Sequence, residues 1–309
     1  MLSLINSTVV DTSIKEELGE QAIQGLLDRQ IETKINWNLI KKLGLIGLDE
    51  ISLRKGHGKF VTLVTSRVNN EISILAVLPG REKVIIQAFL AEIPKKLHKT
   101  IIAFCTDLYE GFINAVKSIF KKKIPVIADR FHVAKLYRKS LITLRKQELK
   151  RLRKKLSEEK YRELKPAIAL FCCQQALIEA EDKEIIEPLF KASPLLKAAY
   201  QFCIELTGIY NSHITPKEAH GKLNQWIVNV ENSQLICFNS FIGTLKKYQN
   251  EIENYFMGRQ SSGFVEGINN KVKVLKRRCY GIYNLAHFFQ RLWLDFSGYA
   301  FFGKKPMTV

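Results

Sequence analysis

The stretch LGLIGLDEISLRKGHGKFVTLVTSRVNNEISILAVL, residues 43–78, holds the pattern that decides the fold. It contains three runs of β-branched and apolar residues, at 43–51, 59–66 and 71–78, separated by polar and turn-forming residues. Such runs are typical of strands. Asn69 and Asn70 tolerate the left-handed backbone of a tight turn, so the second and third runs should form a hairpin. The stretch therefore predicts three consecutive strands joined by hairpins.

Two further strands are predicted after this stretch, at 100–106 (TIIAFCT) and 125–129 (PVIAD). Helical patterns at 81–92 and 109–120 separate the third, fourth and fifth strands. Strand–helix–strand units place their strands parallel in one sheet. The sequence thus predicts an α/β fold with a mixed five-stranded sheet, whose later strands are parallel.

Helical patterns occupy most of the rest of the chain. Apolar spacing in 14–42 indicates a short helical lead-in, and 133–260 has the pattern of consecutive helices. Because no Gly/Ser-rich linker occurs, the second helical block is interpreted as an insertion packed on the sheet domain. The predicted organisation has three parts: a helical lead-in at 1–42, a sheet domain at 43–135 plus 261–300, and a helical insertion at 136–260.

The charge balance indicates a polyanionic partner. Among 309 residues, 48 Lys and Arg face 30 Asp and Glu, which leaves a formal charge of +18 at pH 7. Such an excess suits nucleic acid or an anionic membrane surface. No apolar run approaches the roughly 20 residues of a membrane span, and the first residues lack the pattern of a signal peptide. Nucleic acid in the cytoplasm is the favoured interpretation, without a membrane.

Two other composition signals restrict the function less. The six cysteines are scattered without a C-x-x-C pair, which indicates neither a zinc ribbon nor a disulfide framework. The run HVAKLYRKSLITLRKQELKRLRKKLSEEKYRELK, residues 132–165, is much richer in Lys and Arg than in acids. It fits either a solvated basic helix or a surface that follows a DNA backbone.

Three aspartates lie at or just beyond the ends of predicted strands. Asp49 sits near the end of an apolar strand, where a buried carboxylate needs a partner or a metal. Asp107 and Asp129 come at the ends of the fourth and fifth strands, where each would also serve as an ordinary helix N-cap. Ligands gather beyond the carboxyl ends of strands in open sheets, so Asp49 and Asp107 should converge if their strands are neighbours.

A third candidate carboxylate, Glu266, lies on the predicted helix SSGFVEGINNKVKVLKRRC at 261–279. At 100° per residue, Glu266, Asn270, Lys273 and Arg277 form one polar stripe. An acid in the first turn also stabilises a helix through its dipole, so a structural role stays open for Glu266. The apolar residues of this helix fall on the opposite side: Val265, Ile268, Val272, Leu275 and Cys279.

Two Asp and one Glu from separate elements suit a site for two Mg²⁺ ions, because hard cations prefer oxygen ligands. Two such ions support in-line displacement at a phosphodiester: one activates the attacking water or 3′-hydroxyl and the other stabilises the leaving oxygen. Lys273 and Arg277 would then lie where a DNA backbone must pass. The residues alone thus point to Mg²⁺- or Mn²⁺-dependent chemistry on DNA.

Four stretches together resemble the bacterial insertion-sequence transposases of the ISL3 family, whose catalytic domain has a ribonuclease H-like fold. In family order they are GLDEISLRKGHGKFVTLV (47–64), CTDLYEGFINAV (105–116), ADRFHVAKLYRKSL (128–141) and SSGFVEGINNKVKVLKRRCYGIYNLAHFFQRL (261–292). The resemblance implies a DNA transposase that cleaves and transfers the strands of an insertion sequence. It also implies double-stranded partners, the element ends and target DNA, and a homodimer on DNA.

By this resemblance, Asp49, Asp107 and Glu266 match the DDE triad, and Asp129 with His132 matches a supporting D-x-x-H element. Arg130 would bind phosphate or pair with an acid. Family members usually carry a zinc-binding segment and a helix-turn-helix before this domain, whereas about 40 residues precede the first strand here, so 1–42 is interpreted as a remnant of a DNA-binding region. The alternatives are a related metal-dependent nuclease and a non-catalytic DNA-binding remnant of a transposase.

Overall fold

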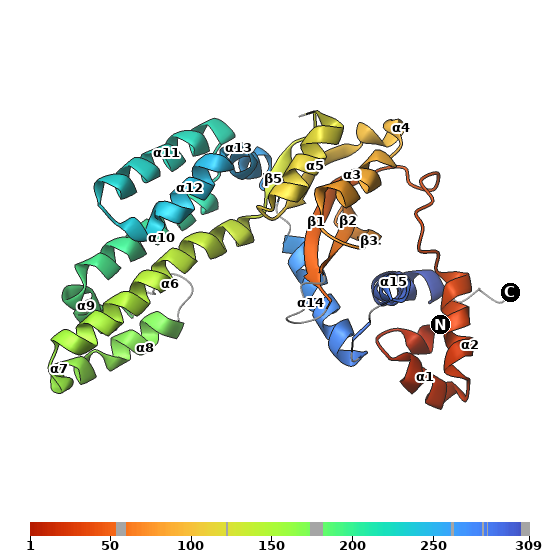
Figure 1. Ribbon diagram of the computed structural model, residues 1–309, viewed down its shortest axis with the longest axis horizontal. Helices are drawn as coiled ribbons and strands as arrows, with labels where there is room; N and C mark the ends of the chain where they lie inside the picture. The colour runs from red at the N-terminus through yellow and green to blue at the C-terminus, as the bar shows by residue number, and fades with distance from the viewer. Residues whose placement is uncertain are drawn as a thin grey trace. The chain divides into compact units, whose positions relative to one another are not determined.

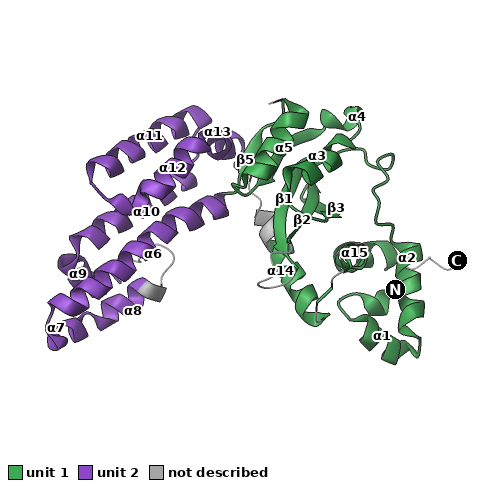
Figure 2. Ribbon diagram, in the orientation of Figure 1, with its two compact units in different colours: residues 1–129, 261–309 green, residues 130–260 purple. Residues whose placement is uncertain are grey.

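The structure, a computed structural model, describes residues 1–53, 60–121, 123–173, 182–260, 263–279, 281–282 and 284–303, with side chains excepted at 172–173 and 263–266. The chain divides into two compact units (Figure 2). Unit 1 combines Met1–Asp129 with Ser261–Val309, and unit 2 is Arg130–Gln260.

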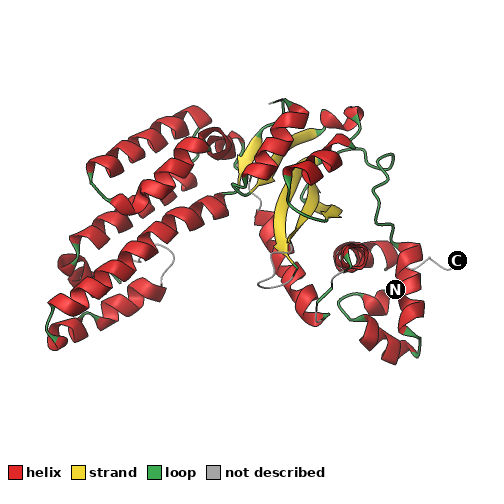
Figure 3. Ribbon diagram, in the orientation of Figure 1, coloured by secondary structure: helices red, strands yellow, loops and turns green. Residues whose placement is uncertain are grey.

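All strands of the described residues belong to unit 1 and form one sheet (Figures 1 and 3). The sheet order is β3-β2-β1-β4-β5, with β3, β2 and β1 antiparallel and β1, β4 and β5 parallel. The strand bounds are β1 Gly44–Ser52, β2 Phe60–Val68, β3 Glu71–Leu78, β4 Ile101–Thr106 and β5 Val126–Ala128. The predicted mixed five-stranded sheet is therefore confirmed, with strand ends displaced by at most two residues.

The hairpin between β2 and β3 forms where the sequence predicts it. Asn69 and Asn70 have φ values of 51° and 68°, the left-handed conformation that a two-residue hairpin turn requires. The turn brings Val68 opposite Glu71 and starts the antiparallel register. Thr65 of β2 is buried, as is Thr62, so the second strand is covered on both of its faces.

Helices of unit 1 pack against this sheet. α14 lies against β1, α15 lies against β3, and α5 lies against β4 and α3. One hydrophobic core joins alternate residues of β1–β3, such as Ile51 and Leu63, to Ile268 on α14 and Phe288 on α15. The helix bounds in unit 1 are η1 Leu2–Leu4, α1 Val9–Glu16, α2 Glu20–Gln30, α3 Lys83–Ala91, α4 Lys95–His98, α5 Glu110–Phe120, α14 Gly263–Arg278 and α15 Leu285–Phe302.

The N-terminal lead-in belongs to the same core. Leu27 of α2 is fully buried in it, together with Leu4 and Ile31. α1 ends where Glu17 adopts a left-handed conformation, with φ of 51°. Residues 31–43 form no helix, so helical structure covers only part of the 14–42 segment. The lead-in helices are thus an integral layer of unit 1.

Unit 2 is helical throughout its described residues. Its core packs aromatic side chains from several helices, among them Tyr137, Tyr210 and Phe238. Trp226 is 2% exposed and donates from Nε1 to the Phe202 carbonyl at 2.9 Å, so it fills this core. The helices are α6 Arg130–Lys155, α7 Glu158–Glu163, α8 Lys165–Cys173, α9 Lys183–Ala192, α10 Pro194–Asn211, α11 Pro216–Asn232, η2 Ile236–Phe238, α12 Asn239–Lys247, α13 Gln249–Glu253 and η3 Asn254–Met257.

The long helix α6 carries the basic run. It buries one narrow stripe, including Val133, Tyr137 and Leu144, at helical spacing. Basic side chains between these positions, such as Lys139 and Lys146, are exposed. The stripe fixes α6 in unit 2 and leaves a row of cations facing solvent. No helix in the described part of the chain has both the length and the apolar character that a membrane crossing requires.

Candidate active site

The pairing of β1 with β4 and the pairing of β4 with β5 end at the same level of the sheet. Leu48 of β1 pairs with Thr106 of β4, and Thr106 pairs with Ala128 of β5. Asp49, Asp107 and Asp129 each follow directly after one of these paired residues. The condition for Asp49 and Asp107 to converge, which the sequence left open, is met because β1 and β4 are neighbours. The register therefore brings the backbones of three carboxylate residues to the same edge of the sheet.

Asp49 is 7% exposed, and β1 continues beyond it to Ser52, paired with β2. Its Oδ1 accepts a hydrogen bond from the Glu50 backbone N–H at 2.9 Å. Its Oδ2 accepts a hydrogen bond from the Asn269 side-chain amide of α14. The buried carboxylate is thus hydrogen-bonded at both oxygens, as a buried charge must be.

Asp107 is half-buried between β4 and α5. Its Oδ1 accepts from the Tyr109 backbone N–H at 3.1 Å and lies 3.5 Å from Thr106 Oγ1. Tyr109, rather than Asp107, is the N-cap residue of α5. The interpretation of Asp107 as the helix N-cap is therefore wrong: its carboxylate orders the turn before the helix, two residues ahead of the cap.

Asp129 is buried, and its backbone N–H donates to the Thr106 carbonyl at 2.8 Å. This bond holds the chain beside β4 at the point where β5 ends. Burial raises the pKa of the neighbouring Cys105 thiol to about 12, and the negative charge of Asp129 acts in the same direction. Cys105 is consequently a neutral core thiol beside the strand ends.

Helix α14 is attached to β1 at two points. Asn269 donates to Asp49, and about two turns further along Lys276 Nζ donates to the Ser52 carbonyl. Burial lowers the pKa of Lys276. Glu266 lies in α14 one turn before Asn269, and its side chain is outside the described residues. The attachment therefore fixes the helix that carries the third candidate carboxylate.

The polar stripe predicted on α14 is partly described. Asn270, Lys273 and Arg277 are exposed, and Lys273 Nζ donates to Asn270 Oδ1 at 3.4 Å. The apolar side is confirmed where it is described, because Ile268, Val272 and Leu275 are buried in the core of unit 1. The exposed cations thus lie on the solvent side of a helix that is anchored to β1.

Arg130 and His132 begin α6 and belong to unit 2. Arg130 donates from Nη1 to Tyr255 Oη at 3.2 Å and from Nη2 to Asn211 Oδ1. These bonds join it to neutral groups. His132 is half-buried, with its ring centroid 6.1 Å from that of Phe131. Within unit 2, both residues are therefore held at the first turn of the basic helix.

Two contributors to the site were missed by sequence reasoning. Asn269 is the α14 amide that contacts Asp49, although the predicted stripe contained its neighbour Asn270. Arg81 forms an ion pair with Glu50, next to Asp49, and its guanidinium lies 5.0 Å from the centroid of the Tyr109 ring. Asn269 lies three residues after Glu266, and this helical spacing was a signal that could have identified it. Arg81 lies in the loop before α3, at the first position of the predicted helical pattern 81–92, and that pattern does not mark it as part of a site.

The metal-binding hypothesis depends on Glu266, whose side chain lies outside the described residues. Among the described side chains, no group of three His, Cys, Asp or Glu has an arrangement that would hold a metal ion. Glu266 is not among the side chains to which that statement applies. The cluster of Asp49, Asp107 and Glu266 therefore stays a prediction.

A mixed five-stranded sheet in this order, flanked by helices, is consistent with a ribonuclease H-like α/β fold. The family model of the ISL3 transposases, described as "Transposase", matches residues 46–292. Because this match covers most of the chain, the chain belongs to the ISL3 transposase family. It is also similar to the transposase for insertion sequence element IS1001 of Bordetella parapertussis, with 25% identity over 285 residues that make up 92% of this chain and 68% of that protein. The resemblance seen in the sequence motifs is thereby confirmed, and the chain is a transposase of the insertion-sequence type.

Proposed function

We propose that this transposase cleaves DNA strands at the ends of an insertion sequence and joins them to target DNA in a metal-dependent reaction. One observation carries the proposal: Asp49 and Asp107 follow paired residues of adjacent parallel strands, and α14, which contains Glu266, is hydrogen-bonded to Asp49. Two carboxylates from the sheet and one from a helix fixed to it form a set that suits DDE chemistry.

The donor set fits Mg²⁺ or Mn²⁺. Asp49, Asp107 and Glu266 offer carboxylate oxygens, which hard divalent cations prefer, and they leave positions for phosphate oxygens. Two ions bound there would supply an activated water or 3′-hydroxyl and a stabilised leaving oxygen for in-line displacement. The hydrogen bonds to both oxygens of Asp49 restrict its carboxylate to one orientation.

The other residues of the site would position DNA. Asn270, Lys273 and Arg277 are exposed on α14 beyond Asn269, where their donors suit phosphate oxygens. We assign Arg130 to the same role at the start of α6. Asp129 and His132 would support the site, Asp129 through its place at the end of β5. The formal charge of +18 favours double-stranded DNA, both element ends and target, as the partner.

The proposal is tested with labelled element ends, a target plasmid and Mg²⁺ or Mn²⁺. We expect D49N, D107N and E266Q each to lower cleavage and joining by at least about a thousandfold, because each removes a ligand charge that no neighbour replaces. DNA affinity should change little, since these acids do not attract phosphate. E92Q, at an exposed carboxylate of unit 1 outside the site, should retain wild-type activity.

The outcomes separate the alternatives. Cleavage without joined products would identify a metal-dependent nuclease instead of a transposase. Activity of D49N equal to that of the wild type would refute the assignment of the site. DNA binding that is the only activity, and that is indifferent to EDTA, would indicate a non-catalytic DNA-binding protein. Sedimentation of the protein on paired element ends would test the expected homodimer.

A further inference from the structure

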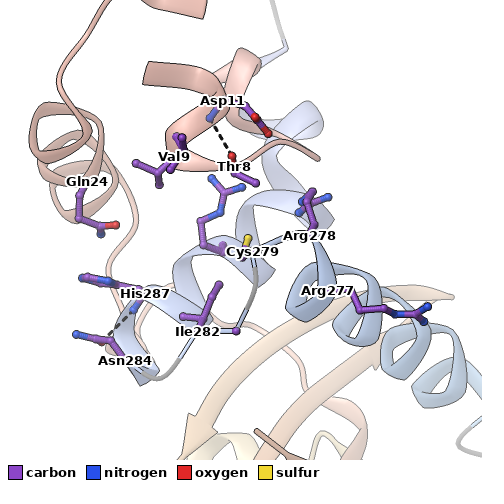
Figure 4. Close-up of a pocket in the computed structure, with 13 residues that line it drawn as sticks. Thr8, Val9, Asp11, Gln24, Arg277, Arg278, Cys279, Ile282, Asn284 and His287 are labelled. Atoms are coloured by element: carbon purple, nitrogen blue, oxygen red, sulfur yellow. Dashed lines mark hydrogen bonds between the residues drawn. The ribbon is translucent and has the colours of Figure 1, made fainter. Parts of the chain in front are cut away.

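Unit 1 contains a second candidate site, a pocket of about 820 Å³ beyond the C-terminal end of α14. Figure 4 shows its labelled lining: Thr8, Val9 and Asp11 from the start of α1, Gln24 from α2, Arg278 and Cys279 from the end of α14, and Ile282, Asn284 and His287 from the turn into α15. Val10, Gly281 and Arg291 complete the lining, and Arg277 lies at its edge, extending away from His287.

The pocket is basic. Three arginines and one histidine line it, against a single acid, Asp11. Arg278 is paired with Asp295, which is not a lining residue. Arg278 Nε still has no hydrogen-bond acceptor among the described residues. With this pair counted as neutral and Arg277 extending away, the attraction for an anion depends on Arg291 and on the unsatisfied N–H of Arg278 rather than on net charge.

Arg291 gives an independent sign that a ligand is missing. It is 2% exposed, and its Nη2 donates to the Leu4 carbonyl at 3.1 Å and to the Ser7 carbonyl. Its Nε and Nη1 have no acceptor with hydrogen-bond geometry within the described part of the chain, although Asp295 and the Cys279 side chain oppose the lowering of its pKa by burial. A buried guanidinium with two unsatisfied donors destabilises the fold. An anion in the pocket would reduce this cost through its negative charge. After a small shift of the side chain, the anion would also accept hydrogen bonds from the two donors.

Two helices begin at this pocket. Thr8 caps α1, accepting from the Asp11 N–H at 2.9 Å, and the following Val9 and Val10 line the pocket. Asn284 caps α15, accepting from the N–H groups of Ala286 and His287 at 2.9 and 3.2 Å. The caps occupy these N–H groups, but the N-terminal end of each helix dipole still carries partial positive charge and adds to the attraction for an anion.

From these observations we infer that the pocket binds a phosphate group carried by a nucleotide, as a site separate from the carboxylates. The guanidinium groups of Arg278 and Arg291 and the two helix N-termini suit phosphate oxygens. Val9, Val10 and Ile282 form an apolar wall that suits a sugar or a base. The volume is within the range of small-molecule pockets and exceeds what inorganic phosphate alone would fill.

The nucleotide has two possible sources, a DNA strand or a free nucleotide, and the DNA source rests on the proposed function. α14 connects the two sites: Asn269 contacts Asp49 and Arg278 lines the pocket. The axial distance between these two residues is about 14 Å at 1.5 Å per residue. A strand that advances about 3.4 Å per nucleotide would cover that distance in about four nucleotides. The pocket is thus about four nucleotides from Asn269 along the axis, but these two residues lie on opposite sides of α14, so a strand would have to pass around the helix to reach it.

The test uses the full chain in EDTA, so that binding is measured without cleavage. Calorimetry gives the affinities of three probes: a nucleoside 5′-monophosphate, the same nucleoside without phosphate, and duplex DNA. Cys279 lines the pocket and reports occupancy through its protection from alkylation, measured by peptide mass spectrometry. Cys237, a partly exposed free thiol of unit 2, is the internal control.

A matched pair of variants isolates the effect of charge. Val10 is 50% exposed in the first turn of α1, where Glu and Gln both fit. V10E places a carboxylate in the pocket, and V10Q places an uncharged group of the same size there. We expect V10E to weaken binding of the monophosphate about tenfold relative to V10Q, because the carboxylate and the phosphate repel each other at short range.

Each outcome decides the inference. A phosphate site is supported if the monophosphate protects Cys279 but not Cys237, and the nucleoside protects neither. If only DNA protects Cys279, the site is supported with a DNA strand as the source of the phosphate. Equal affinity for nucleoside and monophosphate, equal binding by V10E and V10Q, or no binding of any probe at the pocket would overturn it. Because binding is measured in EDTA and does not depend on catalysis, failure of the proposed function and failure of this inference are distinguishable.

Discussion

Asn269 links Asp49 on β1 to α14, the helix that contains Glu266, although these two parts of the candidate active site lie far apart in the sequence. Its amide donates to Asp49 Oδ2, and Glu266 lies one turn earlier on the same helix. The sequence located the helix and its polar side, since both follow from spacing at 100° per residue. It did not distinguish Asn269 from Asn270, because the rotation of α14 about its axis is set by packing of Ile268 and Leu275 on the sheet.

We predict that N269A raises the Mg²⁺ concentration needed for half-maximal strand cleavage by about tenfold, since Asp49 is then no longer oriented by its amide partner. Cleavage rates at a series of Mg²⁺ concentrations measure this shift. N229A, at an exposed asparagine of unit 2, should leave the metal requirement unchanged. A lower rate for N269A with an unaltered metal requirement would instead assign Asn269 a purely structural role.

For Asp49, Asp107 and Asp129, the sequence predicts the positions of the residues but not their hydrogen-bond partners. Their positions at strand ends follow from the sequence, and the parallel register of β1, β4 and β5 then makes them level. The hydrogen-bond partners of these acids come from distant segments or from irregular turns, as with Tyr109. Such contacts carry no periodic signal, so only the structure reveals them.

Glu148 links two helices of unit 2. It lies in the buried stripe of α6 and is paired with Arg151 at 2.7 Å, and it accepts at 2.5 Å from Ser193, the N-cap of α10. The bond to Arg151 is the main cause that lowers the pKa of Glu148 below 4.5, and the bond to Ser193 adds to it. Its stabilising effect is therefore complete above pH 4.5 and is lost as the pH falls through the lowered folded-state pKa.

We predict that E148Q lowers the unfolding free energy of unit 2 by about 1–3 kcal/mol near neutral pH. The difference from the wild type should shrink in acid, because protonation then removes the same charge from the wild type. Urea unfolding followed by Trp226 fluorescence, with Trp37 and Trp293 replaced by Phe, measures it. E158Q, whose exposed carboxylate lies 3.9 Å from Arg162, should change stability by less than about 0.5 kcal/mol. A difference that persists undiminished in acid would contradict the linkage to Glu148.

Helix α15 contacts the N-terminal segment at Gly298. A Cβ atom there would lie 2.9 Å from both Ile5 Cδ1 and Leu294 Cδ1. We therefore expect overpacking in G298A to offset the helix-propensity gain of Ala, so that this variant is about 1 kcal/mol less stable than G267A. G267A, on a helix position with no atom near the added methyl group, should stabilise unit 1 by about 0.4–1 kcal/mol. Denaturant unfolding monitored by Trp293 of α15 compares them, and a G298A variant as stable as G267A would show that Ile5 is free to move aside.

The fold as a whole was predictable where it depends on local pattern. The number of strands and their directions followed from the hairpin at Asn69–Asn70 and from the two strand–helix–strand units. That β1 lies beside β4 is shown only by the structure. The burial of the lead-in was not predictable in the same way. Leu4 and Leu27 join a core with Phe288 and Leu292, more than 250 positions later in the sequence. Local spacing says that α2 has an apolar side but not what covers it.

The basic surface of α6 contributes to the positive charge of the whole chain, and DNA is the proposed partner of that charge. From the sequence, this surface could be either a solvated helix face or a DNA-binding surface. Lys139, Lys146 and Lys150 are exposed along this helix. If each of them binds a phosphate, replacing all three with Gln should make the dependence of log K on log salt shallower by about 0.9 for each phosphate that is no longer bound. The control removes the same charge from α4 and its end, at the exposed Lys95, Lys96 and Lys99. DNA binding at a series of salt concentrations compares the two triple variants. A shallower slope in the α6 variant alone would place phosphates on that helix, whereas equal slopes would mean that α6 contributes only through net charge.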